Sequence, residues 1–195
     1  MIRDYPFIVL EGPDGVGKTT LCDWLSNIYG YKKYKCIGGP FANVRKQFDR
    51  GEVSVSERFS FLCGEAINNS FIINEELKLG NSIVFDRYYY STLAYCEIAK
   101  PGITSNFNFL FNQLPKPNCV FLINSDFETM LSRISKRGDL ANLEKTFTVK
   151  ENYEMLIAKY MEFIGEKICV IDNNKTLDFT KEQIKKVICM KGDVF

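Results

Sequence analysis

Histidine is absent from this chain of 195 residues. A protein without histidine cannot use a histidine-based triad or a histidine general base, and it lacks a principal nitrogen ligand for zinc. Cysteine offers no substitute, because the seven cysteines are an odd number, are scattered along the chain and include no C-x-x-C pair. We therefore expect neither a zinc site nor a disulfide framework, but reduced and buried thiols.

Long apolar runs and an excess of charge of one sign are missing as well. No run approaches the roughly 20 residues that span a bilayer, and no apolar signal-peptide segment precedes Pro6. The formal net charge of +1 leaves no overall basic field that would attract nucleic acid or an anionic membrane. These absences predict a cytoplasmic protein that partners neither nucleic acid nor a membrane.

What the chain does contain is an alternation of short apolar runs with helix-compatible stretches. The runs lack polar alternation, as in strands buried on both faces, and they cover residues 7–10, 82–85, 119–123 and 168–171. The candidate helices cover about 18–29, 55–79, 91–99, 126–136, 148–164 and 180–190. This order predicts an α/β fold with a parallel central sheet and right-handed crossovers. The length and the ordinary composition predict a single domain over residues 1–195.

A phosphate-binding loop follows the first apolar run. The segment Gly12-Pro13-Asp14-Gly15-Val16-Gly17-Lys18-Thr19 fits G-x-x-x-x-G-K-[ST], with a strand pattern before it and a helix pattern after it. Glycines let backbone N–H groups converge on phosphate oxygens at the start of a helix. We expect Lys18 to reach the β- and γ-phosphates and Thr19 to ligate Mg²⁺. The expected ATP-binding residues are Gly12, Asp14, Gly15, Val16, Gly17, Lys18, Thr19 and Thr20.

A second group of chemically active residues ends the apolar run at 82–85. Asp86 at the end of this run can hold the Mg²⁺ shell beside Thr19, and the planar guanidinium of Arg87 suits the phosphate of an acceptor. A GTPase switch is not indicated, because no glycine completes D-x-x-G after Asp86 and Leu177 stands where N-K-x-D requires aspartate. Phosphoryl transfer to a second phosphate is therefore favoured over a switch.

At this point the chain resembles the thymidylate kinase family of nucleoside monophosphate kinases. The matching segments are EGPDGVGKTT, DRYYYSTLAY (86–95), LSRISKRGDLANLE (131–144) and ICVID (168–172), in the order and near the spacing of the family. The resemblance implies a three-layer α/β/α P-loop kinase fold with a short helical lid at about 133–145. It also implies Mg²⁺ as cofactor, ATP and a deoxynucleoside monophosphate as partners, and a homodimer.

The resemblance also assigns roles to residues of the loop and the lid. It implies that Asp14 turns away from the phosphates toward the 3′-hydroxyl of the acceptor sugar; an ion pair of Asp14 with a nearby arginine is the alternative. Some family members carry an arginine in the loop where this chain has Gly15, so the positive charge is expected from the lid. There Arg133 and Arg137 share a helix face, and both are expected to act in catalysis with Lys18 and Arg87.

The expected base site departs from the family pattern. Phe61, or alternatively Phe59, can stack on the base, but the slot of the arginine that donates to thymine O4 holds Glu65. A carboxylate accepts hydrogen bonds and cannot donate to O4. A pyrimidine with a donor at that edge, such as an amino or a hydroxymethyl group, suits Glu65 better than thymine. The alternative is that Glu65 pairs with Arg58 or another cation.

The remaining expected acceptor-binding residues follow from the same resemblance. Arg45, after a shortened Gly-Gly-Pro-Phe segment, is expected to grip the acceptor phosphate together with Arg87. Ser91 and Tyr95 match the base and sugar pocket and share a helix face. The expected activity is ATP- and Mg²⁺-dependent phosphorylation of dTMP or a related pyrimidine deoxynucleotide to the diphosphate. The alternatives are a deoxynucleoside kinase that uses Glu11 as its base, or a non-catalytic nucleotide-binding protein.

Overall fold

A computed structural model describes residues 7–38, 42–45, 48, 53–136 and 145–192, with side chains to residue 189. Five parallel strands form the sheet in the order β2-β3-β1-β4-β5. The strands are β1 (Phe7–Glu11), β2 (Lys32–Lys35), β3 (Ile83–Asp86), β4 (Cys119–Asn124) and β5 (Ile168–Asp172). The central strands β1 and β3 are buried along their whole length, because helices cover both faces of the sheet.

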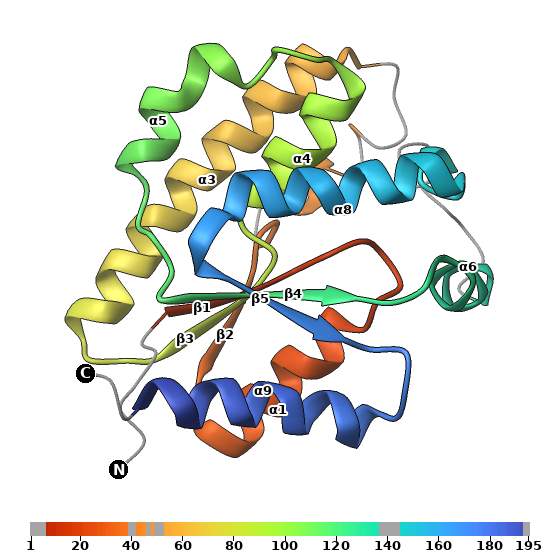
Figure 1. The fold of residues 1–195 in the computed structure, drawn as a ribbon. Helices are drawn as coiled ribbons and strands as arrows, with labels where there is room; N and C mark the ends of the chain where they lie inside the picture. The colour runs from red at the N-terminus through yellow and green to blue at the C-terminus, as the bar shows by residue number, and fades with distance from the viewer. Residues whose placement is uncertain (1–6, 39–41, 46–47, 49–52, 137–144, 193–195) are drawn as a thin grey trace.

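The helices form the two outer layers (Figure 1). One layer contains α3 (Val55–Lys78), α4 (Tyr89–Ala99), α5 (Asn108–Gln113) and α8 (Lys150–Ile164), and the other contains α1 (Lys18–Tyr29) and α9 (Leu177–Gly192). Helix α6 (Phe127–Ser135) lies beyond the carboxyl end of β4. The predicted three-layer fold with a parallel sheet is confirmed.

Two apolar cores hold the layers together. The larger core packs the side chains of one sheet face against α3, α4 and α8 and contains Phe85, Tyr88 and Tyr160. The other packs Leu10 and Phe121 against α1, α6 and α9. Side chains of buried β1 belong to both cores, so the position at which the next loop begins is held by packing on both faces of the sheet.

Strand register brings the expected functional segments to one edge of the sheet. Leu10 pairs with Asp86 of β3 and with Phe121 of β4. All five strands are parallel, so the loops that begin at Gly12 and at Arg87 leave the sheet side by side at its carboxyl edge. Ligands bind at this edge in open α/β sheets.

Sequence patterns did not predict strand β2 or helix α5, and they misplaced some boundaries. Strand β2 has the sequence KKYK and lies at the sheet edge, where lysines are common because they discourage pairing with another chain. Helix α5 spans six residues and is too short for a clear helical period. Helix α4 begins at Tyr89 and α9 at Leu177, both earlier than predicted. Most of the predicted lid, including Arg137, lies outside the described residues.

The expectations for cysteine and for membranes can be compared with the described residues. No disulfide joins any of the seven cysteines, all of which are described. Five of them are buried as expected, but Cys169 is partly exposed and Cys189 is exposed, so that expectation was wrong for two positions. Among the described helices, none is both long enough and apolar enough to cross a membrane.

Candidate functional site

The phosphate loop adopts a conformation that side chains would obstruct. Gly12 has φ +136°, and a Cβ there would lie 2.3 Å from the carbonyl oxygen of Ile123 on β4. Gly15 has φ +81°, and its Cβ would lie 2.8 Å from the side chain of Ile134 on α6. The second contact explains why an arginine could not replace Gly15 here without moving α6. The loop backbone therefore passes close to both β4 and α6.

Helix α1 presents its N-terminus to this loop. Its N-cap is Gly17, and no described side chain caps the first turn, so backbone N–H groups there remain available to an anion. Lys18 is only 6% exposed and its Nζ donates to the carbonyl oxygen of Pro13 at 2.5 Å. Burial, with a further contribution from Arg87, lowers the pKa of Lys18 to about 8. Lys18 is thus a buried cation whose charge a phosphate would stabilise.

Thr19 and Asp86 meet as the sequence predicted. The Thr19 hydroxyl donates to Asp86 Oδ2 at 2.5 Å, which joins the start of α1 to the end of β3. A hydroxyl beside a carboxylate fits Mg²⁺, which takes a few protein oxygens and completes its shell with water and phosphate. Among the described residues no group of three or more His, Cys, Asp or Glu side chains forms an all-protein metal cage. This donor pair therefore suits a metal that arrives with a nucleotide.

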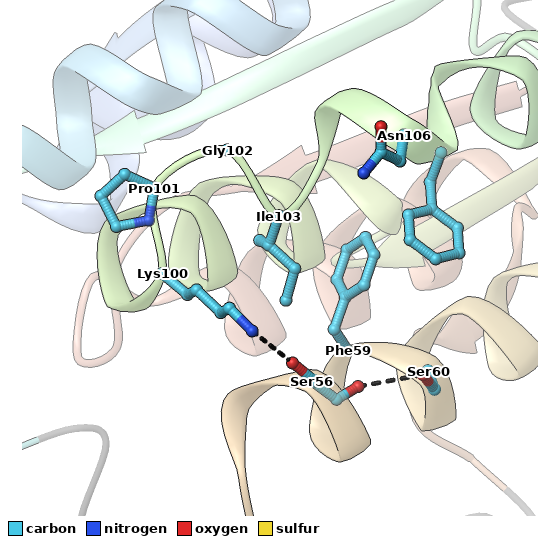
Figure 2. A pocket seen from close by; sticks show the side chains of 9 residues that line it. Ser56, Phe59, Ser60, Lys100, Pro101, Gly102, Ile103 and Asn106 are labelled. Carbon is cyan, nitrogen blue, oxygen red and sulfur yellow. Dashed lines mark hydrogen bonds between the residues drawn. The ribbon is translucent and has the colours of Figure 1, made fainter.

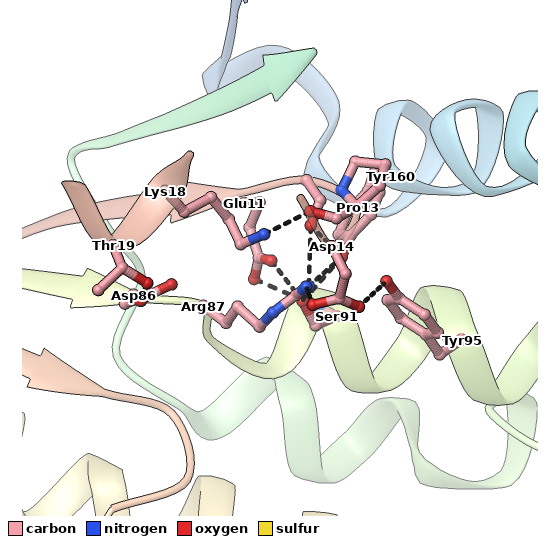
Figure 3. A network of polar contacts seen from close by, with 11 residues as sticks. Glu11, Pro13, Asp14, Lys18, Thr19, Asp86, Arg87, Ser91, Tyr95 and Tyr160 are labelled. Atoms are coloured by element: carbon pink, nitrogen blue, oxygen red, sulfur yellow. Dashed lines mark hydrogen bonds and ion pairs between the residues drawn. The ribbon is translucent and has the colours of Figure 1, made fainter. Parts of the chain in front are cut away.

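Asp14 and Arg87 form the centre of a polar network (Figure 3). Arg87 Nη2 donates to Asp14 Oδ1 at 2.6 Å, and the Tyr95 hydroxyl donates to Asp14 Oδ2 at 3.1 Å. Burial on its own raises the pKa of Asp14, but Arg87 and Lys18 together hold that pKa well below its usual range. The ion pair considered as an alternative for Asp14 is therefore present. Its contact with a sugar hydroxyl stays a prediction.

Several hydrogen bonds to the protein hold the Arg87 side chain in place. Its Nη1 donates to the carbonyl oxygen of Gly12 at 2.8 Å, and to Ser91 Oγ and Tyr160 Oη at 2.9 Å each. The residue adopts φ +70°, a left-handed conformation that is uncommon outside glycine and indicates a constrained position. An acceptor phosphate would have to share the Arg87 guanidinium with these protein partners. The predicted role of Arg87 in acceptor binding remains untested.

Glu11 anchors the start of α4 from the neighbouring strand. Its Oε1 accepts from the backbone N–H groups of Tyr88 and Ser91 at 2.8 and 3.3 Å, and its Oε2 accepts from the Ser91 hydroxyl at 2.5 Å. Tyr88, the N-cap of α4, supplies no side-chain cap of its own. Burial raises the pKa of Glu11 to about 7, although Arg87 and these hydrogen bonds lower it. Both carboxyl oxygens of Glu11 are thus occupied in holding α4.

Arg133 is connected to the phosphate loop by hydrogen bonds that run through one residue, Asn173. Its Nη2 donates to the carbonyl oxygen of Asn173 at 3.0 Å, and Asn173 Nδ2 donates to the carbonyl oxygen of Val16 at 2.7 Å. Arg133 Nη1 is buried without a hydrogen-bond partner among the described residues. The catalytic roles predicted for Arg133 and Arg137 remain predictions.

The two aromatic candidates for base stacking have different environments. The ring of Phe59 already packs against the rings of Phe107 and Phe111, with centroids 5.0 and 6.2 Å away, so stacking on a base would require these core side chains to repack. Phe61 is partly buried and stacks on Phe48, with ring centroids 4.9 Å apart and an angle of 19° between the rings. Phe61 is therefore the better placed of the two, and Phe48 already offers it a planar partner.

Glu65 is buried one helical turn beyond Phe61. Only 1% of Glu65 is exposed, and neither carboxyl oxygen has a hydrogen-bond partner among the described residues. The alternative pairing of Glu65 with Arg58 is not among the hydrogen bonds and ion pairs of the described residues. Arg45 is the cation that acts electrostatically on Glu65. The structure thus associates Arg45 with Glu65; the predicted contact of Arg45 with the acceptor phosphate and the predicted contact of Glu65 with the base stay predictions.

Sequence patterns did not identify two residues that complete the site. Tyr160 of α8 contacts Arg87 and Ser91, and Asn173 after β5 holds the loop at Val16. Tyr160 lies 73 and 69 positions from Arg87 and Ser91, Asn173 lies 157 positions from Val16, and neither belongs to a recognisable motif. A polar residue directly after the last strand run was the one available signal for Asn173.

A separate pocket of about 310 Å³ lies between the start of α3 and the segment that links α4 to α5 (Figure 2). Lys100 crosses it and donates to Ser56 Oγ at 2.8 Å, while Phe59 and Ile103 provide apolar walls. Of the residues considered for the site, the pocket is lined by Phe59, the alternative stacking residue, and it is separate from the phosphate loop.

Comparison with known proteins gives consistent matches over nearly the whole chain. A family model described as thymidylate kinase matches residues 10–184. A probable thymidylate kinase from Archaeoglobus fulgidus is 32% identical over 196 residues and covers 93% of each chain. A deoxyguanosine kinase from Bacillus subtilis is 28% identical over 187 residues and covers 89% of each. The solved thymidylate kinase of Candida albicans shares the fold, with a TM-score of 0.76 and 22% identity over 94% of this chain and 91% of that one.

Proposed function

The chain belongs to the thymidylate kinase family of nucleoside monophosphate kinases, and from that premise we propose how its site works. The γ-phosphoryl group of ATP is transferred to the 5′-phosphate of dTMP or a related pyrimidine deoxynucleotide, which gives the diphosphate. The observation that carries this proposal is the convergence of buried Lys18, the open N-terminus of α1 and the Thr19–Asp86 pair at one edge of the sheet.

The proposed mechanism uses position and charge rather than a strong base. A nucleoside monophosphate is already ionised near neutral pH, so one of its phosphate oxygens can attack the γ-phosphorus in line. Lys18 neutralises β- and γ-oxygens, and backbone N–H groups of the loop hold the remaining phosphate oxygens. Thr19 and Asp86 would hold Mg²⁺, which would supply positive charge against the charge that develops on the phosphates. Arg133 and Arg137 are proposed to supply further positive charge from the lid side.

The acceptor is proposed to lie against the Asp14–Arg87 network. Asp14 would accept from the 3′-hydroxyl of the sugar while it keeps its bond to Arg87, because a carboxylate has about four lone-pair sites. Arg87 and Arg45 would contact the acceptor phosphate, Phe61 would stack on the base, and Ser91 and Tyr95 would shape the sugar pocket through the hydrogen bonds they already make.

A deoxynucleoside kinase is the second candidate, and the Bacillus subtilis relative favours keeping it. Such an enzyme needs a base that removes the proton of the 5′-hydroxyl. Glu11 has a suitable pKa of about 7, but both of its oxygens are engaged at the start of α4. This engagement favours the monophosphate as acceptor. The retention of Lys18, Thr19 and Asp86 argues against a non-catalytic nucleotide-binding protein.

The deciding experiment is a coupled assay of ADP release with a panel of acceptors. The panel contains dTMP, dUMP, dCMP and dGMP together with thymidine and deoxyguanosine, each with ATP and Mg²⁺. We expect turnover with a pyrimidine monophosphate and little with either nucleoside. Turnover confined to the nucleosides would identify a deoxynucleoside kinase, and ATP binding without turnover of any acceptor would indicate a non-catalytic protein.

We also propose a homodimer, as the family resemblance implies. Helix α3 carries Ile67 and Phe71 four positions apart on one face, and they are 39% and 68% exposed. Exposed apolar side chains that lie together are common at interfaces between subunits. Sedimentation velocity tests this proposal, and a mass of one chain, 22.5 kDa, at micromolar concentration would contradict it.

A further inference from the structure

Glu65 is a buried carboxyl group that accepts no hydrogen bond from any described residue, and this is unusual in a folded protein. It is 1% exposed, and no described residue forms a hydrogen bond with either of its oxygens. Buried polar groups that remain unsatisfied are often completed by a ligand or have a functional role.

The surroundings of Glu65 connect it to the acceptor side of the site. Asn69, one turn further along α3, donates to the carbonyl oxygen of Cys36, which follows β2. The backbone N–H of Cys36 donates to the carbonyl oxygen of Asp86 at 3.1 Å. The Cys36 thiol experiences the charges of both Glu65 and Arg87. Glu65 therefore lies at the carboxyl ends of β2 and β3, one helical turn from the aromatic ring of Phe61.

The charge state of Glu65 follows from this environment. Burial raises the pKa of its carboxyl group to about 8, while Arg45 and, more weakly, the backbone of Gly38 lower it. In the described part of the chain, no hydrogen bond joins Gly38 to either carboxyl oxygen of Glu65. Burial also raises the pKa of the Cys36 thiol well above its usual range, so this neighbour stays neutral. Near neutral pH Glu65 is mostly a neutral acid, with one O–H donor and one carbonyl acceptor.

We propose that Glu65 reads the acceptor base as a neutral carboxylic acid: its O–H donates to a ring carbonyl oxygen and its C=O accepts from the adjacent ring N–H. This inference rests on the proposed function. The O4 and N3–H of thymine or uracil offer this acceptor and donor side by side. The neutral acid removes the objection that a carboxylate would face O4 lone pair against lone pair. An ionised Glu65 would instead suit a base edge with two adjacent donors, such as the N1–H and amino group of guanine.

The test compares three enzymes with dTMP as acceptor between about pH 7 and about pH 9.5. They are the wild type, Glu65→Gln and Glu75→Gln, the last being an exposed carboxylate on the same helix. An amide presents an N–H donor and a carbonyl acceptor but does not titrate. We expect Glu65→Gln to keep kcat/KM within a few-fold near pH 7. Above about pH 8 the wild-type to Glu65→Gln ratio should fall and approach a tenfold loss per pH unit, the limit for one proton.

The ratio isolates Glu65, because the substrate and every other residue titrate alike in the three enzymes. Glu75→Gln should follow the wild type at every pH. A ratio that stays flat would overturn the proposal, and so would a ratio that rises with pH, which would show that the ionised form binds the base. Wild-type enzyme that turns over no monophosphate would refute the proposed function and this inference with it, whereas turnover of dTMP with a flat ratio would refute the inference alone.

A second measurement does not depend on whether Glu65→Gln folds. Calorimetric titration of the wild type with dTMP near pH 9, in two buffers of different ionisation enthalpy, counts the protons taken up on binding. We expect uptake that approaches one proton, because binding selects the protonated form of Glu65. Binding without proton uptake would contradict the proposal.

Discussion

At the scale of single residues, Asp14 has two roles, one observed and one proposed. It is paired with Arg87 at 2.6 Å and receives a hydrogen bond from Tyr95, and it is also proposed to accept from the acceptor's 3′-hydroxyl. We expect Asp14→Asn to lower kcat/KM for dTMP by about 10- to 100-fold, the range for one hydrogen bond to a charged group. The same substitution should matter much less with 3′-deoxy-dTMP, which lacks the partner hydroxyl.

Steady-state kinetics of both enzymes with both acceptors form a double-mutant cycle for this contact. A matching decrease with the two acceptors would show that Asp14 acts on the reaction only through Arg87. The melting temperature should be measured in parallel, because Asp14→Asn also removes the carboxylate from a largely buried ion pair.

Lys18 gives a second prediction at this scale. Its Nζ is buried, and within the described part of the chain it donates one hydrogen bond, to the carbonyl oxygen of Pro13. We expect Lys18→Ala to lower kcat by about 10²–10³ or more, as the loss of one preorganised charge on a transition state does. The melting temperature should change by only a few degrees, since Lys18 forms no ion pair within the described structure. The control is Lys185→Ala, which removes a partly exposed lysine on α9.

Turnover of Lys18→Ala close to the wild-type kcat would mean that the loop does not cradle the transferred phosphate. A large loss of folded protein would instead make Lys18 a structural residue. Circular dichroism and the melting temperature distinguish these two results from the expected one.

At the scale of elements, Glu11 links a strand to the start of a helix and makes the stability of that junction depend on pH. Its folded pKa of about 7 lies above the unfolded value of 4.5. Between these values the folded state binds a proton that the unfolded state has lost, so stability decreases as pH rises from about 4.5 to about 7 and is constant above. This difference of about 2.5 between the two pKa values of Glu11 corresponds to roughly 3 kcal/mol in the free energy of unfolding.

Glu11→Gln should remove this dependence while it keeps the anchor of α4. The amide oxygen can accept from the N–H groups of Tyr88 and Ser91, and the amide nitrogen can donate to the Ser91 hydroxyl. Urea unfolding at about pH 5 and about pH 8 measures the effect as the change in the wild-type free energy minus that of the variant. Parallel pH profiles for the two proteins would indicate that Glu11 is not protonated in the folded state.

At the scale of the whole molecule, the metal is expected to belong to the reaction and not to the fold. No group of three or more potential ligand side chains occurs among the described residues, and the Thr19–Asp86 pair already makes a direct hydrogen bond. Removal of Mg²⁺ with EDTA should abolish phosphoryl transfer and leave the melting temperature of the nucleotide-free protein unchanged. With ATP present, Mg²⁺ should raise the melting temperature, because a ligand that binds only the folded state stabilises it. A lower melting temperature on chelation alone would reveal a structural metal site.

The order of elements and the phosphate loop could be predicted from local patterns. Strands such as Phe7–Glu11 are continuous apolar runs because both faces are covered, and the loop sequence specifies glycines where backbone must approach β4 and α6. These signals lie within a few neighbouring residues, so no knowledge of the partner elements was needed. The Thr19–Asp86 contact also followed, because the carboxyl ends of adjacent parallel strands share one edge.

Other features depend on residues that are distant in sequence. The partnership of Asp14 with Arg87, the contacts of Tyr160 and the support of the loop by Asn173 arise only when β3 pairs with β1, β5 pairs with β4 and α8 packs on the sheet. The edge strand β2 was not predicted, because its lysines are typical of a sheet edge and do not form the apolar run of a buried strand. The charge state of Glu65 is the clearest example of a feature that could not be predicted from the sequence. A sequence gives the residue type, but the free energy of ionising a carboxyl group depends on how much water, and which charges, the folded chain leaves around it.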